Sequence, residues 1–517
     1  MVRANRAASP ARTMETMMTK LSARGLAGAL LGAALLTGVA VPAALAQDFD
    51  PDASIHIGSL YEPQNLDNTA GAGQGINEAF NSNVYEALFQ LTDAGTVVPQ
   101  LAQSFTKSDD GLTYTFKLQP NVTFHNGDKL TSADVKSSIE RVTADGSKSS
   151  RKSSLKTIAS IETPNDATVV IKLSAKSISL PYNLSYVWIV DHTAKDITSS
   201  EDGTGPYKLG EWRRGSALSL ERFDGYWGAK PTNKEVVFQY FTDATAENNA
   251  LLTGAVDLIT SVQSPDSLAQ FKGNSAFTVS SGQSTTKLLL AYNDRVKPFN
   301  DVNVRKAITR AIDKKALLQS IWGDYGTVIG SMVPPTDPWY EDLTGVDAYN
   351  PDSAKQLLAQ AGYANGLTFT LDTPDYDPHP VVAQFIQSEL KQIGVTVNIN
   401  IITANEWYTK VYQKHDFVAT LQEHVNHRDV VFYGNPDFYW GYNNPEVQKL
   451  IADSEAASST DEQTADLKKA NEIIANDAAS DWIYLYPQIV VSSAKVTGYP
   501  VNGLNSQFFV YGIKKAK

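Results

Sequence analysis

The sequence predicts an α/β protein in which both halves of the chain mix helices and strands. Segments that alternate apolar and polar side chains, the pattern of half-buried strands, are scattered along the whole chain. Segments with apolar residues at helical spacing lie between them, and no internal repeat is present. Since 42% of the 517 residues are hydrophobic, the chain can bury the cores of two to four domains of ordinary size.

The first 46 residues are predicted to be a secretory signal. Lys20 and Arg24 supply positive charge, and residues 26–41 are apolar and rich in small side chains. The small-x-small triplet from Ala44 to Ala46 then precedes polar residues, so cleavage is expected after Ala46. A retained membrane anchor is the alternative, but the run is short and rich in glycine and alanine. The pattern predicts a periplasmic or secreted protein.

The amino-terminal half of the remaining chain is predicted to be rich in strands. Residues 112–118 (LTYTFKL) alternate cleanly and follow a turn at Asp109-Asp110-Gly111. A helix is expected to begin at Ser132, which can cap it, and the polar residues 145–154 are expected to form an exposed loop. The other expected elements are strands at 53–60, 122–124, 168–173, 218–222, 236–240 and 256–259, and helices at 76–88 and 245–253.

The carboxyl-terminal half is predicted to be a second α/β region, which opens with a strand at 288–292. Helices are expected at 302–320, 351–361, 381–393 and 465–476, and strands at 367–373, 395–401 and 417–421. The alternation of the two periodicities favours strands covered by helices.

Composition excludes several classes of function. The net charge is -12, from 44 Lys and Arg against 56 Asp and Glu, which argues against a nucleic-acid partner. Cysteine is absent, so disulfides, thiolate metal sites, a cysteine nucleophile and a lipid-bearing cysteine are all excluded for this sequence. Serine-hydrolase, zinc-protease, P-loop and dinucleotide-binding motifs are also absent, which predicts a protein that is not an enzyme and needs no cofactor.

Several stretches, in order along the chain, carry a distinctive pattern. They are Val84 to Val135 (beginning VYEAL and ending TSADV), Gly203 to Pro231 (GTGPYKLGEWRRGSALSLERFDGYWGAKP), Lys297 to Leu317 (KPFNDVNVRKAITRAIDKKAL), Tyr349 to Tyr363 (YNPDSAKQLLAQAGY) and Ile386 to Ile399 (IQSELKQIGVTVNI). Together they resemble the family-5 extracellular solute-binding proteins, which serve oligopeptide, dipeptide, nickel and opine importers of the ABC type.

The resemblance implies an architecture like that of type II periplasmic binding proteins, with two lobes joined by a hinge and ligand held between them. The first lobe is expected to comprise residues 47–90, 206–288 and 489–517. A strand-rich insertion subdomain is expected at 91–205, and the second lobe at 289–488. The partners implied are an ABC permease and its ATPase subunits, with the binding protein itself a monomer.

The segment after the strand at 417–421 is the first candidate for ligand recognition. In peptide-binding relatives, an aspartate in a Gly-Trp-x-x-Asp-Tyr-x-Asp-Pro segment pairs with the peptide's α-amino group. This sequence has QEHVNHRD at the equivalent place, without the Gly-Trp pair. The candidate residues here are Glu423, His424, Asn426, His427, Arg428 and Asp429.

These residues suit charged ligand ends. Arg428 can clamp a carboxylate, while Glu423 or Asp429 can meet an ammonium group. The alternatives are a solvated loop or a structural ion pair between Arg428 and Asp429. His424 and His427 have a spacing that permits metal ligation, but two histidines on a loop are weak support, and no metal site is predicted.

Further candidates lie outside that segment. Tyr61, Glu62 and Asn65 follow the first strand, where the resemblance places cleft residues. Trp440 belongs to a downstream group of aromatic residues, of which one or two are expected to line the cleft and the rest to pack in the core.

The sequence therefore predicts the substrate-binding component of an ABC importer that closes over a short peptide or peptide-like zwitterion. An opine, a sugar conjugate or a metal chelate such as nickel is the alternative within the same family. An exported hydrolase is the alternative from another class, disfavoured by the missing motifs.

Overall fold

The computed structural model describes residues 48–70, 74–149, 151–194, 196–198, 200–262 and 265–517. The signal segment predicted at 1–46 lies outside these residues. None of the described helices is both long enough and apolar enough to cross a membrane.

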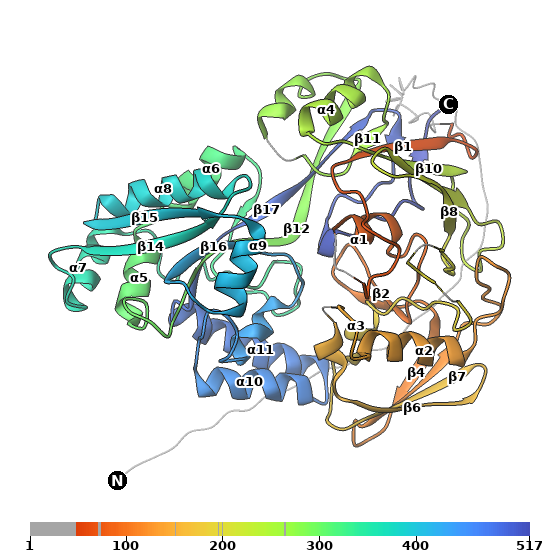
Figure 1. The fold of residues 1–517 in the computed structure, drawn as a ribbon, viewed down its shortest axis with the longest axis horizontal. Coiled ribbons are helices and arrows are strands. Elements are labelled where there is room, and N and C mark those ends of the chain that lie inside the picture. Colours follow the sequence, from red (N-terminus) through yellow and green to blue (C-terminus); the bar gives the residue numbers. More distant parts are fainter. Residues whose placement is uncertain (1–47, 71–73, 150, 195, 199, 263–264) are drawn as a thin grey trace, which may run out of the picture. The chain divides into compact units, whose positions relative to one another are not determined.

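A large mixed sheet organises the described residues (Figure 1). It has 11 strands in the order β15-β14-β16-β12-β17-β11-β1-β10-β9-β8, and β13 pairs with β17 beside this path. The strands are β1 Ser54–Ser59, β8 Tyr207–Arg213, β9 Ala217–Arg222, β10 Glu235–Tyr240, β11 Leu258–Ile259, β12 Phe277–Tyr292, β13 Thr327–Val328, β14 Leu367–Pro374, β15 Val395–Ile402, β16 Ala419–His424 and β17 Ser480–Ser493. Strands from both halves of the chain therefore belong to one continuous sheet.

The helices of the described residues flank this sheet and a smaller one. They are α1 Gln74–Phe80, α2 Ser132–Thr143, α3 Leu180–Leu184, α4 Ala244–Thr253, α5 Val302–Arg310, α6 Lys314–Trp322, α7 Pro351–Gln360, α8 His379–Lys391, α9 Ala404–Trp407, α10 Pro445–Ala456 and α11 Thr460–Asn476. Shorter helical turns are η1 Lys152–Leu155, η2 Pro265–Gln270, η3 Tyr408–Gln413, η4 Asp429–Gly434 and η5 Leu504–Ser506.

The smaller sheet has four antiparallel strands in the order β4-β5-β7-β6, and α2 packs against β6 and β7. The strands here are β4 Ala102–Lys107, β5 Thr113–Leu118, β6 Ile158–Asn165 and β7 Thr168–Leu173. Along β5, inward-facing Tyr114, Phe116 and Leu118 are buried, as the alternation in the sequence predicts. Two short pairs complete the strands, β2 Phe89–Leu91 with β3 Val97–Pro99, and β18 Val496–Thr497 with β19 Lys514–Lys515.

Separate apolar cores accompany these sheets. One core lies within residues 88–189 around the four-stranded sheet. Two more lie within residues 288–485, on β12, β14 to β17 and their helices. A fourth draws on both ends of the chain, joining β1 and α1 to residues 490–513. Strands β12 and β17 each contribute side chains to more than one of these cores, so they connect the cores.

Several predicted boundaries are wrong, for local reasons. The helix expected at 76–88 ends at Phe80, because Asn83 donates its side-chain amide to the carbonyls of Glu78 and Ala79 and closes the last turn. Ser82, two residues after the helix end, has a left-handed backbone conformation with a φ of 57°. The helix end is therefore made by a side chain.

The helix expected at 302–320 is two helices, α5 and α6. Asp313 caps the second by accepting a hydrogen bond from Ala316 N over 3.0 Å. The strand expected at 122–124 is only an isolated bridge between Thr123 and Lys129, and η1 lies within the loop expected at 145–154. Elements α3, α10, β4, β6, β8 and β17 were not predicted from the sequence, and the predicted start of β12 is eleven residues late.

Candidate functional site

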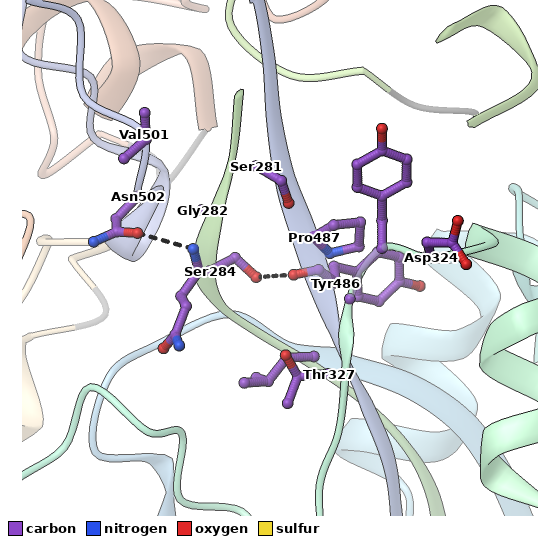
Figure 2. A pocket seen from close by; sticks show the side chains of 13 residues that line it. Ser281, Gly282, Ser284, Asp324, Thr327, Tyr486, Pro487, Val501 and Asn502 are labelled. Atoms are coloured by element: carbon purple, nitrogen blue, oxygen red, sulfur yellow. Dashed lines mark hydrogen bonds between the residues drawn. The ribbon is translucent and has the colours of Figure 1, made fainter. Parts of the chain in front are cut away.

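A cavity of about 360 Å³ lies beside the paired strands β12 and β17 (Figure 2). Its lining comes from residues 281–284 of β12, 485–487 of β17, the 324–327 segment and Val501 with Asn502. By the predicted bounds, these segments belong to both lobes. The cavity therefore lies where a two-lobed binding protein is expected to hold its ligand.

Close backbone packing fixes the walls of this cavity. A Cβ on Gly282 would lie 1.9 Å from the carbonyl oxygen of Val501, so only glycine allows the two segments to approach. Gln283 N donates to Asn502 Oδ1 over 2.9 Å, and Ser284 Oγ donates to the Tyr486 carbonyl over 2.7 Å. Figure 2 shows these two bonds on the cavity wall.

The strand ladder is interrupted beside the cavity. Gln283 pairs with Pro487, but the register shifts before the next pair, which is Lys287 with Leu485. In the gap, Thr285 Oγ1 donates to the Val425 carbonyl over 2.7 Å and accepts from Asn505 N over 3.1 Å. The irregularity lets β12 hold the 423–429 segment and the 501–506 segment at once.

Glu423, predicted from the sequence, lies next to the cavity. Burial raises the pKa of its carboxyl to about 7, although the hydroxyls of Tyr376 and Tyr486 favour the ionised form. Tyr486 also lines the cavity. Among the described residues, no cation forms an ion pair with this carboxylate, and the buried Tyr486 hydroxyl lacks a hydrogen bond of good geometry. Unpaired polar groups on a cavity wall favour a polar ligand.

The turn after β16 is built around a buried ion pair. Lys287 Nζ lies 3.0 Å from Asp429 Oδ2, and these side chains are 0% and 1% exposed. The same Nζ donates to the Asn426 carbonyl over 2.6 Å, and Asn426 N donates to Asp429 Oδ2 over 3.1 Å. Asp429 is thus engaged by Lys287 and not by Arg428, and of the two acids proposed for an ammonium group only Glu423 remains unpaired.

Arg428 is held out of this turn in a left-handed backbone conformation, with a φ of 67°. Its guanidinium carbon lies 4.1 Å from the ring centroid of Tyr182 and 4.9 Å from that of Trp339. Arg428 Nη1 donates to Ser179 Oγ over 3.0 Å, while its buried Nε has no partner. A strained position and an unsatisfied cationic donor are both common at ligand sites.

A second arginine, which the sequence analysis missed, lies nearby. The guanidinium carbon of Arg151 is 3.6 Å from the ring centroid of Tyr186, and Arg151 Nη2 donates to Asn426 Oδ1 over 3.3 Å. None of the described carboxylates forms an ion pair with Arg151 or Arg428. Arg151 belongs to the low-complexity stretch predicted to be an exposed loop, so no sequence signal marked it.

The two arginine–tyrosine pairs are joined to each other. The hydroxyls of Tyr182 and Tyr186 are 3.2 Å apart, and Tyr182 Oη donates to the His427 carbonyl over 3.1 Å. Asn505 Nδ2 donates to Tyr186 Oη over 2.6 Å, and Asn505 Oδ1 accepts from His427 N over 3.0 Å. Asn505 thus connects the arginine–tyrosine pairs to the short segment that also carries Asn502 of the cavity wall.

The two histidines of the segment have separate partners. Nε2 of His424 lies 3.0 Å from Tyr439 Oη, and burial lowers the pKa of His424 to about 4. Nε2 of His427 lies 2.5 Å from Asp337 Oδ1. In the described residues, the one group of three possible metal ligands within reach of one another is Asp134, Asp191 and His192, far along the chain from this segment.

The candidate residues after β1 form hydrogen bonds with nearby parts of the chain. Glu62 accepts hydrogen bonds from Trp212 Nε1 and Gly215 N, each over 3.0 Å. Asn65 Oδ1 accepts from Asp67 N over 2.7 Å and closes a turn, while Tyr61 N donates to Ser59 Oγ over 3.0 Å. The three residues are near neighbours along the chain after β1.

Trp440 is fully buried. Its ring stacks on Tyr433 with centroids 4.3 Å apart and lies 5.3 Å from the ring of His424. Its Nε1 has no hydrogen-bond partner among the described residues. Trp440 therefore packs beside the ring of His424.

The described residues thus include a cavity beside β12 and β17, one carboxyl without a cation and two guanidinium groups without carboxylate partners. Arginine forks recognise carboxylates, and an acid beside them recognises an ammonium group. Such groups can pair with charged groups of a small solute.

Comparison with known proteins identifies the family. The family model for bacterial extracellular solute-binding proteins, family 5 Middle, matches residues 96–426. The chain therefore belongs to family 5 of the bacterial extracellular solute-binding proteins, a family of substrate-binding components of ABC importers and not of enzymes.

Relatives match the chain over most of its length. The glutathione-binding protein GsiB of Pectobacterium atrosepticum is 28% identical over 486 residues, covering 87% of this chain and 91% of GsiB. The structure of the binding protein AgaA from A. tumefacien R10, in complex with agropinic acid, is 25% identical with a TM-score of 0.75 and covers 90% of this chain and 99% of AgaA.

The oligopeptide-binding protein AppA of Bacillus subtilis, in complex with a nonapeptide, shares the fold. It is 23% identical, with a TM-score of 0.74, and covers 91% of this chain and 100% of AppA. These likenesses show the two-lobed type II architecture that the sequence predicts.

Proposed function

We propose that this protein binds a short peptide or peptide-like zwitterion, with carboxylates at Arg151 and Arg428 and an ammonium group at Glu423. The single observation that carries the proposal is the charge arrangement. Two guanidinium groups without carboxylate partners and one carboxyl without a cation are connected, through Asn505 and Tyr486, to the segments that line one cavity. Buried charges are stable only when paired, and a ligand with opposite charges supplies the missing partners.

The dimensions suit a molecule of dipeptide to tripeptide size. The cavity volume of about 360 Å³ lies in the lower part of the range, roughly 300–1,000 Å³, of small-molecule sites. Glu423 and Asn426, which contacts Arg151, are three residues apart, so their backbones are separated by at most about 10 Å. A ligand with charged groups at its two ends spans such a distance.

Reduced glutathione is the first probe to use, because the GsiB relatives are glutathione-binding proteins. It carries one ammonium group and two carboxylates, which matches one unpaired acid and two unpaired guanidinium groups. His424, Asn426, His427 and Asp429 then support the site from the turn. Tyr61, Glu62, Asn65 and Trp440 stay as candidates for its periphery.

The proposed role needs no chemistry on the ligand. Lobe one comprises residues 47–90, 206–288 and 489–517, the insertion subdomain 91–205, and lobe two 289–488. The lobes close on the solute because it binds the closed arrangement more tightly. The protein, exported with cleavage near Ala46, acts as a monomer and presents the closed form to an ABC permease and its ATPase subunits.

Mass spectrometry of small molecules released by denaturing the purified protein tests the proposal, together with calorimetric titration of reduced glutathione. We expect a released peptide or peptide-like zwitterion and saturable binding of one glutathione per chain. A released sugar conjugate or nickel chelate, with no heat on adding glutathione or di- and tripeptides, would contradict it. Conversion of the peptide into products would contradict the non-enzymatic role.

A further inference from the structure

The turn before α3 meets helix α10 through one carboxylate. Ser177 Oγ and Ser179 Oγ both donate to the carboxylate of Glu455, the second over 2.6 Å. The backbone N of Ile178, between the two serines, donates to the Glu455 carbonyl over 2.9 Å. Nearby, Lys107 Nζ donates to the Ser458 carbonyl over 3.1 Å. Residues more than 270 positions apart thus meet along a line of directed hydrogen bonds.

Ser179 also belongs to the candidate ligand site. Its Oγ accepts hydrogen bonds from Arg428 Nη1 and from Gln463 Nε2, each over 3.0 Å. The same oxygen donates its proton to Glu455 Oε2. One hydroxyl therefore connects the carboxylate on α10 to the arginine that we assign to a ligand carboxylate, and its donor and acceptor capacity is fully used.

The charges favour this connection. Among the described residues, no cation forms an ion pair with Glu455. Its carboxylate accepts hydrogen bonds from the two serine hydroxyls, and its main-chain carbonyl accepts one from a backbone amide. Hydrogen bonds to an ionised carboxylate are about twice as strong as those between neutral groups. By the bounds above, the bonds join the insertion subdomain to lobe two, so they exist only while those two parts touch.

We propose that Ser179 and Glu455 form a latch between the insertion subdomain and lobe two, in which closing the latch also orients Arg428 toward the ligand. The proposal rests on the proposed function, since it takes Arg428 as a ligand contact. Ser179 is a positioning residue here and does not touch the ligand. Ligand affinity and lobe closure are coupled through this hydroxyl because each favours the same arrangement.

The variants that test the latch are Ser179→Ala and Glu455→Gln, alone and combined, in the complete exported chain. Asp453→Asn is the matched control, because it removes the same charge from α10 at an exposed residue whose partner is Lys449 on the same helix. Thermal melting within a few degrees of the unchanged protein establishes that each variant folds.

Hydrogen exchange without added ligand reports on the latch alone. We expect the Ile178 amide to exchange at least 5-fold faster in Ser179→Ala and Glu455→Gln, and unchanged in Asp453→Asn. Equal exchange in all four proteins would overturn the latch. This readout does not depend on which solute the protein binds.

Glutathione titration reports on the coupling to Arg428. We expect a roughly 5- to 10-fold weaker affinity for each single variant, and no further loss in the double variant. Fully additive losses would show that the two side chains act independently and would overturn the coupling. If the unchanged protein binds no glutathione, the proposed function fails for this ligand, and the exchange of Ile178 alone decides the latch.

Discussion

Lys287 on β12 and Asp429 at the start of η4 form an ion pair of 3.0 Å with almost no solvent exposure. The pair joins β12 to the turn that carries Asn426 and Arg428. Lys287 also fixes the Asn426 carbonyl over 2.6 Å. The position of this turn is therefore set by a buried charge on β12.

Removing one partner of this pair is expected to destabilise the protein strongly. Lys287→Met leaves Asp429 buried without a cation, which costs about 3–5 kcal/mol of unfolding free energy. Urea denaturation measures the loss. Lys172→Met is the control, because its pair with Glu162 is about half exposed and is worth about 1 kcal/mol or less. A loss of equal size in the two variants would show that burial of the pair is unimportant.

Arg151→Gln is expected to weaken glutathione binding without loss of fold. A hydrogen bond to a charged group contributes about 1.5–3 kcal/mol, so the affinity should fall about 10- to 150-fold. Calorimetry measures this loss. Lys152→Gln removes the neighbouring positive charge, whose nearest carboxylate is the exposed Asp145, and should leave the affinity unchanged. Equal losses in both variants would point to general electrostatic attraction instead of a specific clamp.

Binding is expected to tighten as the pH rises from 6 to 8. Burial raises the pKa of Glu423 to about 7, and an ammonium group pairs only with the ionised carboxylate. Below pH 7 the ligand must displace a proton, so affinity should be roughly tenfold lower at pH 6 than at pH 8. Glu423→Gln should bind weakly and equally at both values. Glu221→Gln, at an exposed strand position, should keep the dependence.

Stability is expected to fall on acidification through His424. Burial lowers the pKa of His424 to about 4, with Asp429 acting in the opposite direction and Lys287 in the same direction. Between about pH 6.5 and 4 the unfolded chain binds a proton that the folded chain does not, so stability is lost as the pH falls. The full effect is about 3 kcal/mol.

Urea titrations at pH 7 and pH 5 measure this effect in the unchanged protein and in His424→Gln, which should lose less stability on acidification. His192→Gln is a contrasting control, because its hydrogen bond to Asp134 raises the pKa of His192 and favours the folded state at low pH. An unchanged acid dependence in His424→Gln would exclude His424 as a source.

Gly282→Ala is expected to disturb the cavity wall. The added Cβ would lie 1.9 Å from the Val501 carbonyl oxygen, so the 501–506 segment must move, at a cost of about 1–3 kcal/mol. Thermal melting and glutathione affinity should both fall. Gly345→Ala, where no atom lies within 4 Å of an added Cβ, should change neither.

The sequence by itself determined the α/β class, most of the regular strands and helices, and the family. The alternation along 112–118 and the helical spacing along 381–393 correspond to β5 and α8 because burial on one face imposes those periods. The sequence also marked Glu423 and Arg428, because they follow the strand at 417–421, where the family resemblance places an acid that pairs with a peptide's amino group.

The tertiary structure decided which of the marked residues stay unpaired. Asp429 and Arg428 are neighbours in sequence, yet Lys287, 142 positions earlier than Asp429, takes the carboxylate. Arg151 was predicted to lie in an exposed loop. In the structure its guanidinium packs on the ring of Tyr186 and donates a hydrogen bond to Asn426. Local sequence patterns report only on burial and near neighbours along the chain, whereas a binding site depends on which distant segments the fold brings into contact.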